Sequence, residues 1–211
     1  MFSAADLPDI VPLFPLPGAI VLPRGHLPLQ IFEPRYLAML EDALKTPHRF
    51  IGMIQPLGQD ERNLHAIGSA GRVSSFAETD DGRYMITLTG ISRFRIIEEI
   101  DGFTAYRRAR VSWTDFHSDL ARSVQDTKFQ RQEFLALLRR YLSANELSTD
   151  WDSLKEAGDE ILINSLSMMC PFQFEDKQAL LEAPTLADRR ETLVTLMEYA
   201  LHSGSNGDVM Q

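Results

Sequence analysis

One stretch of sequence determines the fold class of the amino-terminal half: Arg72-Val-Ser-Ser-Phe-Ala-Glu-Thr-Asp-Asp-Gly-Arg-Tyr-Met-Ile-Thr-Leu-Thr89. It places the pair Asp81-Gly82 between two runs of β-forming residues. An Asp-Gly pair in that setting is the strongest short-range signal for a β-hairpin, because both residues accept the positive φ angles of a tight turn. We therefore predict that Arg72–Glu78 pairs with Arg83–Thr89 as two antiparallel strands.

A second pair, Asp101-Gly102, repeats the pattern further along the chain. It predicts another hairpin, in which Arg93–Ile100 pairs with Phe103–Val111. Apolar and polar residues alternate in these strands, which predicts one buried and one solvated face. The expected buried residues are Tyr84, Ile86, Leu88, Phe94 and Ile96, and the expected exposed ones are Met85, Thr87, Arg93 and Arg95.

Upstream of the hairpins the sequence is rich in proline and contains further short apolar runs. Strands are predicted at Val11–Leu16, His26–Phe32 and Phe50–Leu57, and Gly68–Gly71 predicts a strand entry with a bulge. Proline cannot donate to a strand ladder, so the strands that carry Pro12, Pro15 and Pro28 are expected to be edge strands, or to have these prolines at their ends. Six or seven short strands in this half favour a small barrel or a strongly bent sheet.

Helical signals interrupt the strands once and then dominate the second half. Pro34 suits a first helical position, and Pro47 ends the helix that it begins. From residue 117 onward apolar residues recur at helical spacing. Five helices are predicted. The first contains Phe134–Leu142, the second follows a cap at Thr149 or Asp150, and the third begins at Asp159. The fourth spans Glu175–Ala183, and the last follows a capping box formed by Thr185 and Asp188.

Composition limits the classes of protein that the chain can belong to. It has 211 residues, a net charge of −9 and one cysteine, Cys170, which excludes an internal disulfide and a multi-thiolate metal site. Residues 1–116 carry 12 basic and 14 acidic residues, whereas residues 117–211 carry 9 and 16. The acidic second half disfavours general binding of nucleic acid. Because no apolar stretch is long enough for a membrane span and no signal peptide is visible, we expect a cytoplasmic protein without membrane contact.

Motifs for catalysis, cofactors and metals are not found in the sequence. It has no Gly-Lys dipeptide for a phosphate loop, no Gly-x-Ser-x-Gly motif, and five scattered histidines. Cys170 is interpreted as a buried small apolar residue, and the basic cluster Arg107, Arg108 and Arg110 as a solvated strand edge. We therefore predict no catalytic residue, no cofactor and no metal.

Four ordered blocks resemble the substrate-binding amino-terminal domain of Lon proteases. The first is Leu13-Phe-Pro-Leu-Pro-Gly-Ala-Ile-Val-Leu-Pro23 followed by Leu27-Pro-Leu-Gln-Ile-Phe-Glu-Pro-Arg-Tyr36. The others are Ile67-Gly-Ser-Ala-Gly-Arg-Val73, Gly82-Arg-Tyr84 with Leu88-Thr-Gly-Ile-Ser-Arg-Phe-Arg-Ile96, and Asp176-Lys-Gln-Ala-Leu-Leu-Glu-Ala183 with Asp188-Arg-Arg190. The resemblance extends over about residues 10–202.

The resemblance implies an α+β fold, with a β-rich, PUA-like pseudo-barrel lobe followed by an α-helical bundle lobe. We place the lobes at residues 1–116 and 117–203, with a flexible tail at 204–211. The ATPase and protease domains of Lon have no counterpart in the sequence. We therefore expect a stand-alone, non-enzymatic member of the family, for which a peptidase or ATPase label would reflect only the family name.

The resemblance also implies a protein- or peptide-binding function. Expected partners are unfolded proteins or peptide segments, with a protease as a further partner, and oligomerisation stays open. Phe32, Arg35 and Tyr36 are the candidate contact residues: the two rings would offer apolar contact, and Arg35 would pair with a carboxylate or carbonyl. Core packing of the rings and an internal ion pair of Arg35 are alternative interpretations. RNA binding, a structural adaptor of a protease system, and a hydrolase with an unrecognised site are the alternative functions.

Overall fold

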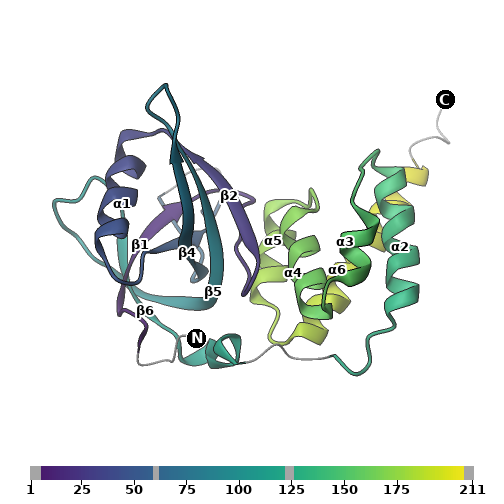
Figure 1. Cartoon of the computed structure of the whole chain (residues 1–211). Coiled ribbons are helices and arrows are strands. Elements are labelled where there is room, and N and C mark those ends of the chain that lie inside the picture. The colour runs from purple at the N-terminus through teal and green to yellow at the C-terminus, as the bar shows by residue number, and fades with distance from the viewer. Residues whose placement is uncertain (1–5, 59–61, 122–125, 207–211) are drawn as a thin grey trace. The chain divides into compact units, whose positions relative to one another are not determined.

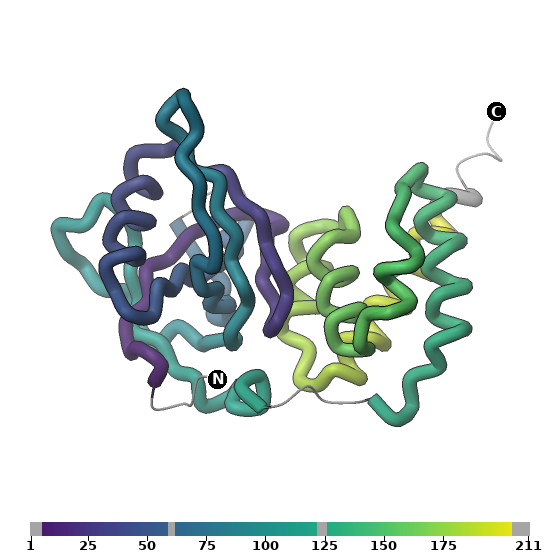
Figure 2. Tube along the Cα trace, in the orientation of Figure 1, coloured from purple at the N-terminus to yellow at the C-terminus, as the bar shows by residue number. Residues whose placement is uncertain are grey.

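A computed structural model of the chain describes residues 6–58, 62–121 and 126–206 (Figure 1, Figure 2). The chain divides into two compact units, residues 1–122 and 123–211. In the described part of the chain, the β-sheet lies in the first unit and the regular elements of the second are all helices, so the predicted α+β class is confirmed. Among the described residues, no helix has the length and apolar character needed to cross a membrane. The predicted tail begins within the last helix, and its residues 207–211 lie outside the described part.

Among its described residues, the first unit contains six strands, the α-helix α1 and the 3-10 helix η2. They are β1 (Ile10–Pro15), β2 (His26–Ile31), α1 (Pro34–Lys45), β3 (Phe50–Ile54), β4 (Ile67–Glu78), β5 (Tyr84–Glu99), β6 (Arg108–Ser112) and η2 (Thr114–Leu120). The strand order is β2-β5-β4-β3-β1-β6, and β6 also pairs with β5. This last pairing closes a ring of five strands, with β2 outside it as an edge strand. The predicted strongly bent sheet is therefore a ring of paired strands.

The long strand β5 makes this closure possible. Its first part, from Tyr84 to Thr89, pairs with β2, and its last part, from Arg95 to Glu99, pairs with β6. All its pairings are antiparallel, whereas β1 and β3 are parallel, so the sheet is mixed.

Two glycines make room for the central core side chain, Phe94. A Cβ on Gly52 would lie 3.0 Å from its ring, and a Cβ on Gly68 would lie 2.8 Å from it. Phe94 is fully buried and packs edge-on against Trp113, with ring centroids 5.8 Å apart. Because the sheet closes around a bulky ring, small residues are needed on the strands that approach it most closely.

The prolines have two different positions in the sheet. Pro28 lies in the edge strand β2, as predicted. The expectation of an edge strand is wrong for β1, which lies between β3 and β6. β1 changes partner along its length: Ile10–Pro12 pairs with β6, and Leu13–Pro15 pairs with β3. Pro12 is tolerated because it lies in the half that has only one partner, and Pro15 ends the strand.

The two Asp-Gly pairs behave differently. Around Asp81-Gly82 the predicted hairpin is confirmed: Arg72 pairs with Thr89 and Glu78 with Tyr84, and Gly82 has a φ of 76°. A register shift does occur between Ala70 and Gly71, where a bulge was predicted, but the extra residue is Ile91 on β5 and not a residue of β4. The end of β5 pairs with β6 as predicted, but the connection spans residues 100–107 and is not a tight turn at Asp101-Gly102.

Two predictions about arginines are wrong. Arg93 was expected on a wet face, yet its side chain is buried, because it pairs with the buried carboxylate of Asp119 at 2.8 Å. The Arg107–Arg110 cluster does not lie at a solvated sheet edge, because β6 pairs on both sides.

The second unit contains five helices among its described residues. They are α2 (Arg131–Ala144), α3 (Trp151–Glu156), α4 (Asp159–Met169), α5 (Phe174–Glu182) and α6 (Leu186–Asn206). Two predicted caps are confirmed. The Asp150 side chain accepts hydrogen bonds from the amides of Asp152 and Ser153. Thr185 and Asp188 form the reciprocal pair of a capping box, with distances of 3.1 and 3.2 Å.

Candidate functional site

The three predicted contact residues lie where β2 ends and α1 begins. Pro34 occupies the first turn of α1, where its missing N–H costs no hydrogen bond. Helical geometry from this point turns the Tyr36 side chain into the core, where its ring centroid lies 4.2 Å from that of Phe14. The Arg35 guanidinium lies 4.4 Å from the Tyr36 ring centroid, and its Nε donates to Glu33 at 3.0 Å.

Arg35 and Tyr36 line the same cavity, of about 170 Å³, which we call the corner cavity. Its other wall is the 100–107 connection, which contributes Tyr106 and Arg107. Arg107 is held in place by Glu99, whose Oε2 accepts from its Nε at 2.7 Å. The structure therefore combines two of the predicted residues with a loop that lies about 70 positions further along the sequence.

Tyr106 fixes the connection to the helix. Its hydroxyl donates to Oδ2 of Asp42 in α1 at 2.9 Å, across 64 residues of sequence. Burial, together with the Asp42 carboxylate, raises the pKa of Tyr106 to about 12. Hydrogen bonds from Lys45 and then from Tyr106 lower the pKa of Asp42. At neutral pH the hydroxyl is therefore a proton donor to an ionised carboxylate, which is a strong type of hydrogen bond.

Phe32 does not line the corner cavity. It follows β2 directly, and its ring centroid lies 5.8 Å from the guanidinium of Arg83, which belongs to the turn between β4 and β5. Strand alternation places Phe32 on the same face as Gln30, which pairs with Met85. The ring is 57% exposed, so it can contact a partner without rearrangement.

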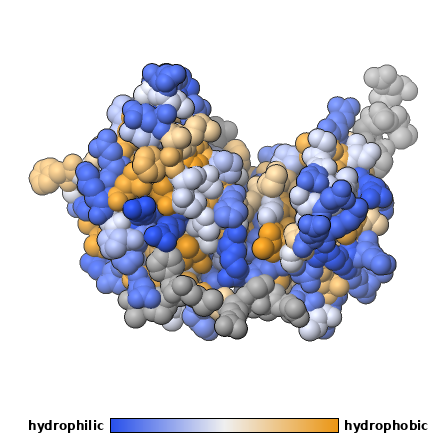
Figure 3. Space-filling model, viewed as in Figure 1, coloured by the Kyte–Doolittle hydropathy of each residue, from blue (hydrophilic) through white to orange (hydrophobic). Residues whose placement is uncertain are grey.

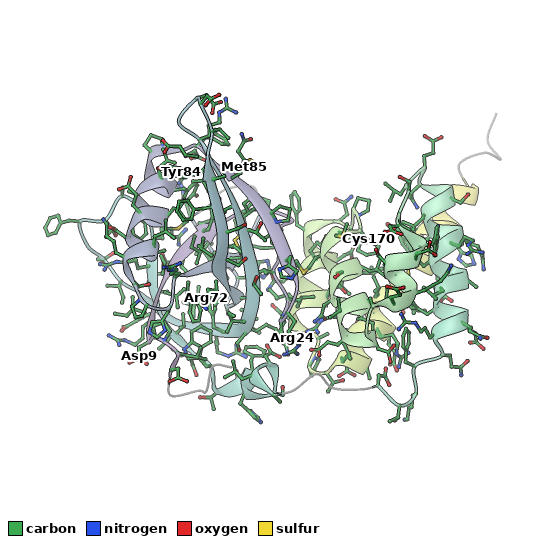
Figure 4. The ribbon with its side chains drawn as sticks, viewed as in Figure 1. Asp9, Arg24, Arg72, Tyr84, Met85 and Cys170 are labelled. Atoms are coloured by element: carbon green, nitrogen blue, oxygen red, sulfur yellow. The ribbon has the colours of Figure 1, made fainter. Side chains whose placement is uncertain are left out.

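Further apolar side chains are exposed on the β4–β5 hairpin. Met85 is 44% exposed and Phe76 is 54% exposed. Met85 and its neighbour Tyr84 point to opposite sides of β5 (Figure 4), and Phe76 pairs with Ile86 on the side of Tyr84. Figure 3 shows hydrophobic surface below the charged tip of this hairpin. We call these exposed apolar residues, Phe32 and Met85 on one face of the hairpin and Phe76 on the other, the hairpin surface.

Hydrogen bonds and an ion pair connect the residues at the tip of the hairpin. The amide of Thr79 donates to the carbonyl of Arg83 at 2.8 Å, and the amide of Gly82 donates to the carbonyl of Thr79 at 2.9 Å. Arg83 also forms an ion pair with Asp81 at 3.0 Å. The hairpin surface therefore presents apolar side chains on both faces of a preformed element with charged residues at its tip, and exposed apolar side chains bordered by charge are typical of interaction sites.

Sequence reasoning did not identify Phe76, Met85 or Tyr106 as site residues. The alternation predicts that Met85 lies on the solvated face, and an apolar methionine on that face is a detectable sign of an interaction site. Phe76, in a run otherwise formed by small and polar residues, is another. Tyr106 has no such signal, because its importance comes from Asp42, which is distant in the sequence.

The rest of the described chain offers little for chemistry. No three His, Cys, Asp or Glu side chains within residues 6–58, 62–121 and 126–206 are grouped to hold a metal ion. Cys170 is buried, as predicted, and burial raises its pKa to about 11, which keeps the thiol protonated and unreactive at neutral pH.

Known proteins resemble the chain in sequence and in fold. It is 23% identical to Lon protease 2 of Myxococcus xanthus over 93% of its own length, and 28% identical to Lon protease 1 of Bdellovibrio bacteriovorus over 89%. In both cases it spans only 24% of the relative's length.

Two solved structures share the fold. One is the Lon N-terminal domain protein from Xanthomonas campestris, with a TM-score of 0.61, 22% identity, and coverage of 88% of this chain and 97% of that one. The other is the N-terminal domain of the Mycobacterium avium complex Lon protease, with a TM-score of 0.64, 18% identity, and coverage of 90% and 98%.

Residues 10–199, which cover most of both units, match the family of ATP-dependent protease La (LON) substrate-binding domains. The match contains the β2–α1 corner, the β4–β5 hairpin and all five helices of the second unit up to Tyr199. The chain therefore belongs to the Lon substrate-binding domain family.

Proposed function

We propose that this chain is a non-catalytic polypeptide-binding domain that holds unfolded or extended segments on the hairpin surface. Family membership supports a role in binding protein substrates. The observation that carries the proposal is the exposure of Phe32 and Met85 on one face of the β4–β5 hairpin and the strand beside it, and of Phe76 on the other face. Apolar side chains of an unfolded segment gain free energy by covering such a surface.

Arg35 and the corner cavity supply the polar part of the proposed site. Arg35 stacks on the buried Tyr36 and is held by Glu33, so its guanidinium is oriented before a partner arrives. In this proposal Phe32 makes direct apolar contact and Arg35 pairs with a carbonyl or carboxylate of the segment. Tyr36 is buried, so in this proposal its ring holds the stacked Arg35 in position and does not contact the segment itself.

Added-strand pairing on β2 contributes less in this proposal. The amide of Gly90 donates to the carbonyl of Gly25, so the two residues are hydrogen-bonded to each other between the β2 and β5 sides of the sheet. Alternation then directs the backbone groups of Leu27, Leu29 and Ile31 toward β5, and those of His26, Pro28 and Gln30 toward the edge. Pro28 has no N–H to offer there, which blunts the edge against another strand.

The charges of the first unit favour protein over RNA as the partner. Arg83, Arg95, Arg107 and Arg110 each have a guanidinium nitrogen within 3.0 Å of a carboxylate oxygen. Phosphate binding needs cationic groups whose charge is not already compensated. The adaptor alternative concerns the same kind of surface and differs only in having one folded partner.

The test is the affinity for a permanently unfolded protein, measured by fluorescence anisotropy with a reduced, carboxymethylated and labelled polypeptide. Replacing Phe32, Phe76 and Met85 together by serine should weaken binding about tenfold or more, because each removes apolar area worth on the order of 1 kcal/mol. Ile97→Ser is the matched control, since Ile97 is also 57% exposed and lies on β5. Equal affinity of the triple variant and the control would contradict the proposal. Selective binding of one folded partner, without affinity for the unfolded chain, would support the adaptor.

A further inference from the structure

A second cavity, of about 180 Å³, lies in the first unit next to the corner cavity, and Tyr106 lines both. We call it the Arg108 cavity. It is bounded by the start of β1, the end of α1 and the start of β6. Its apolar walls are Pro8, Ile10, Pro12 and Phe50, and its polar side chains include Asp42, His48, Tyr106 and Arg108.

Arg108 differs from the other arginines of its cluster. Arg107 is paired with Glu99, and Arg110 is paired with Glu98. Within the described part of the chain, the Arg108 side chain makes no hydrogen bond or ion pair, although its Nε is buried. A buried donor without an acceptor is unfavourable, so such a group in a native cavity needs an explanation.

The surroundings of Arg108 leave its charge in excess. The carboxylate of Asp42, which also lines the cavity, interacts electrostatically with Arg108. That carboxylate already accepts hydrogen bonds from Lys45 at 3.1 Å and from Tyr106 at 2.9 Å. One positive charge therefore faces a cavity with apolar walls. The complementary ligand has one negative charge, planar acceptors and an apolar body.

The 100–107 connection leaves space for the guanidinium of Arg108 at Gly102. A Cβ built on Gly102 would lie 2.9 Å from Nη2 of Arg108, and Gly102 has no positive φ angle. Glycine is therefore useful at this position because it leaves space for the guanidinium, and not because of a turn conformation. Gly102 of the second Asp-Gly pair thus lies next to the guanidinium, although it does not itself line the cavity.

We infer that the Arg108 cavity binds a monocarboxylate that carries a small apolar group. The guanidinium forms a fork that matches a carboxylate, and Pro8, Ile10 and Phe50 cover the apolar group. A phosphate dianion fits less well, since Asp42 would repel the second charge. The size is suitable, because a cavity of ~150 Å³ holds a benzene ring.

Two sources can supply this chemistry: a free short-chain acid, and the carboxyl-terminal residue of a peptide with an apolar side chain. The inference does not depend on the hairpin surface, which is a separate part of the unit. Binding of the peptide and not of the free acid would link the cavity to the proposed function. Binding of the free acid alone would make it an independent small-molecule site.

The test uses the full chain with four probes: 4-methylpentanoate, 4-methylpentanamide, acetyl-Gly-Leu with a free carboxylate, and the same dipeptide as its amide. Affinities are measured by titration followed by amide chemical shifts of the protein. At least one carboxylate should bind ten or more times more tightly than its amide. Arg108→Gln should remove this preference, and Arg110→Gln, two residues along β6, should retain it.

Two further measurements keep the test decisive. Gly102→Ala displaces the guanidinium without altering Arg108, and should weaken carboxylate binding several-fold. The triple serine variant of the hairpin surface should bind the carboxylate as the wild type does, so failure here is separable from failure of the proposed function. The inference is overturned if no carboxylate binds at millimolar concentration, if acids and amides bind equally, or if a folded Arg108→Gln variant binds like the wild type.

Discussion

Arg93 of β5 and Asp119 of η2, which lie 26 residues apart, form a buried two-pronged ion pair. Nε of Arg93 donates to Oδ2 of Asp119 at 2.9 Å, and Nη2 donates to Oδ1 at 2.8 Å. The amide of Arg93 also donates to Oδ2 at 3.0 Å, and the guanidinium lies 4.6 Å from the Phe116 ring centroid. The pair fixes the segment after β6 against the strand ring.

Asp119→Ala should therefore lower the free energy of unfolding by about 3–5 kcal/mol, because it leaves the Arg93 charge buried without compensation. Urea unfolding followed by circular dichroism measures this loss. Asp115→Ala is the control: Asp115 pairs with Arg95 at 2.7 Å, but both side chains are exposed, so its loss should cost no more than about 1 kcal/mol. Similar losses for the two variants would show that burial does not determine the strength of the pair.

Gly90→Ala should be among the most destabilising single substitutions in the first unit. A Cβ at this position would lie 1.9 Å from the carbonyl oxygen of Leu22, which belongs to the backbone and cannot move alone. Gly90 also exchanges backbone hydrogen bonds with Arg24 and Gly25. Gly82→Ala should cost only about 1–2 kcal/mol, from its positive φ of 76° in open space. The ranking is checked by the unfolding midpoints, and the reverse order would contradict the close approach at Gly90.

Lys177 should make stability depend on pH. Its side chain is buried, and its Nζ donates to the carbonyls of Ser167 and Met168 at the end of α4. Burial lowers its pKa to about 8. Between pH 8 and about 10 the unfolded chain holds this proton while the folded chain releases it, so stability rises with pH in that window.

The measurement compares Cys170→Ala with Cys170→Ala/Lys177→Met by urea unfolding at pH 7 and pH 9.5. Removing Cys170 is necessary because its raised pKa, about 11, has the opposite effect at high pH. The protein that retains Lys177 should gain about 2 kcal/mol relative to the double variant between these two pH values. A difference that is constant with pH would mean that Lys177 keeps its ordinary pKa in the folded protein.

Local signals in the sequence predicted the elements whose cause is local. Asp81-Gly82 forms its turn, Pro34 begins α1, and Thr185 caps α6 together with Asp188, because each of these residues acts on backbone within four positions. The change of partner along β1 and the burial of Arg93 could not be predicted in this way. Both depend on residues that are close only after the strand ring has closed.

The candidate site shows the same division. The sequence indicated the β2–α1 corner, and Arg35 and Tyr36 do line a cavity there. The opposite wall of that cavity, with Tyr106, comes from a connection that the sequence predicted as a tight turn at Asp101-Gly102. A single arginine-rich run also gave no sign that Arg107 and Arg110 are paired with carboxylates while Arg108 is not.

Binding of unfolded polypeptide to the hairpin surface is tested most directly by mapping the residues that contact the polypeptide on the isotope-labelled full chain. Amide chemical shifts are recorded while a reduced and carboxymethylated protein is added. The largest changes are expected in residues 30–37 and 74–87, around Phe32, Phe76 and Met85. Binding with its largest changes confined to other residues, or the absence of any change at saturating concentration, would contradict it.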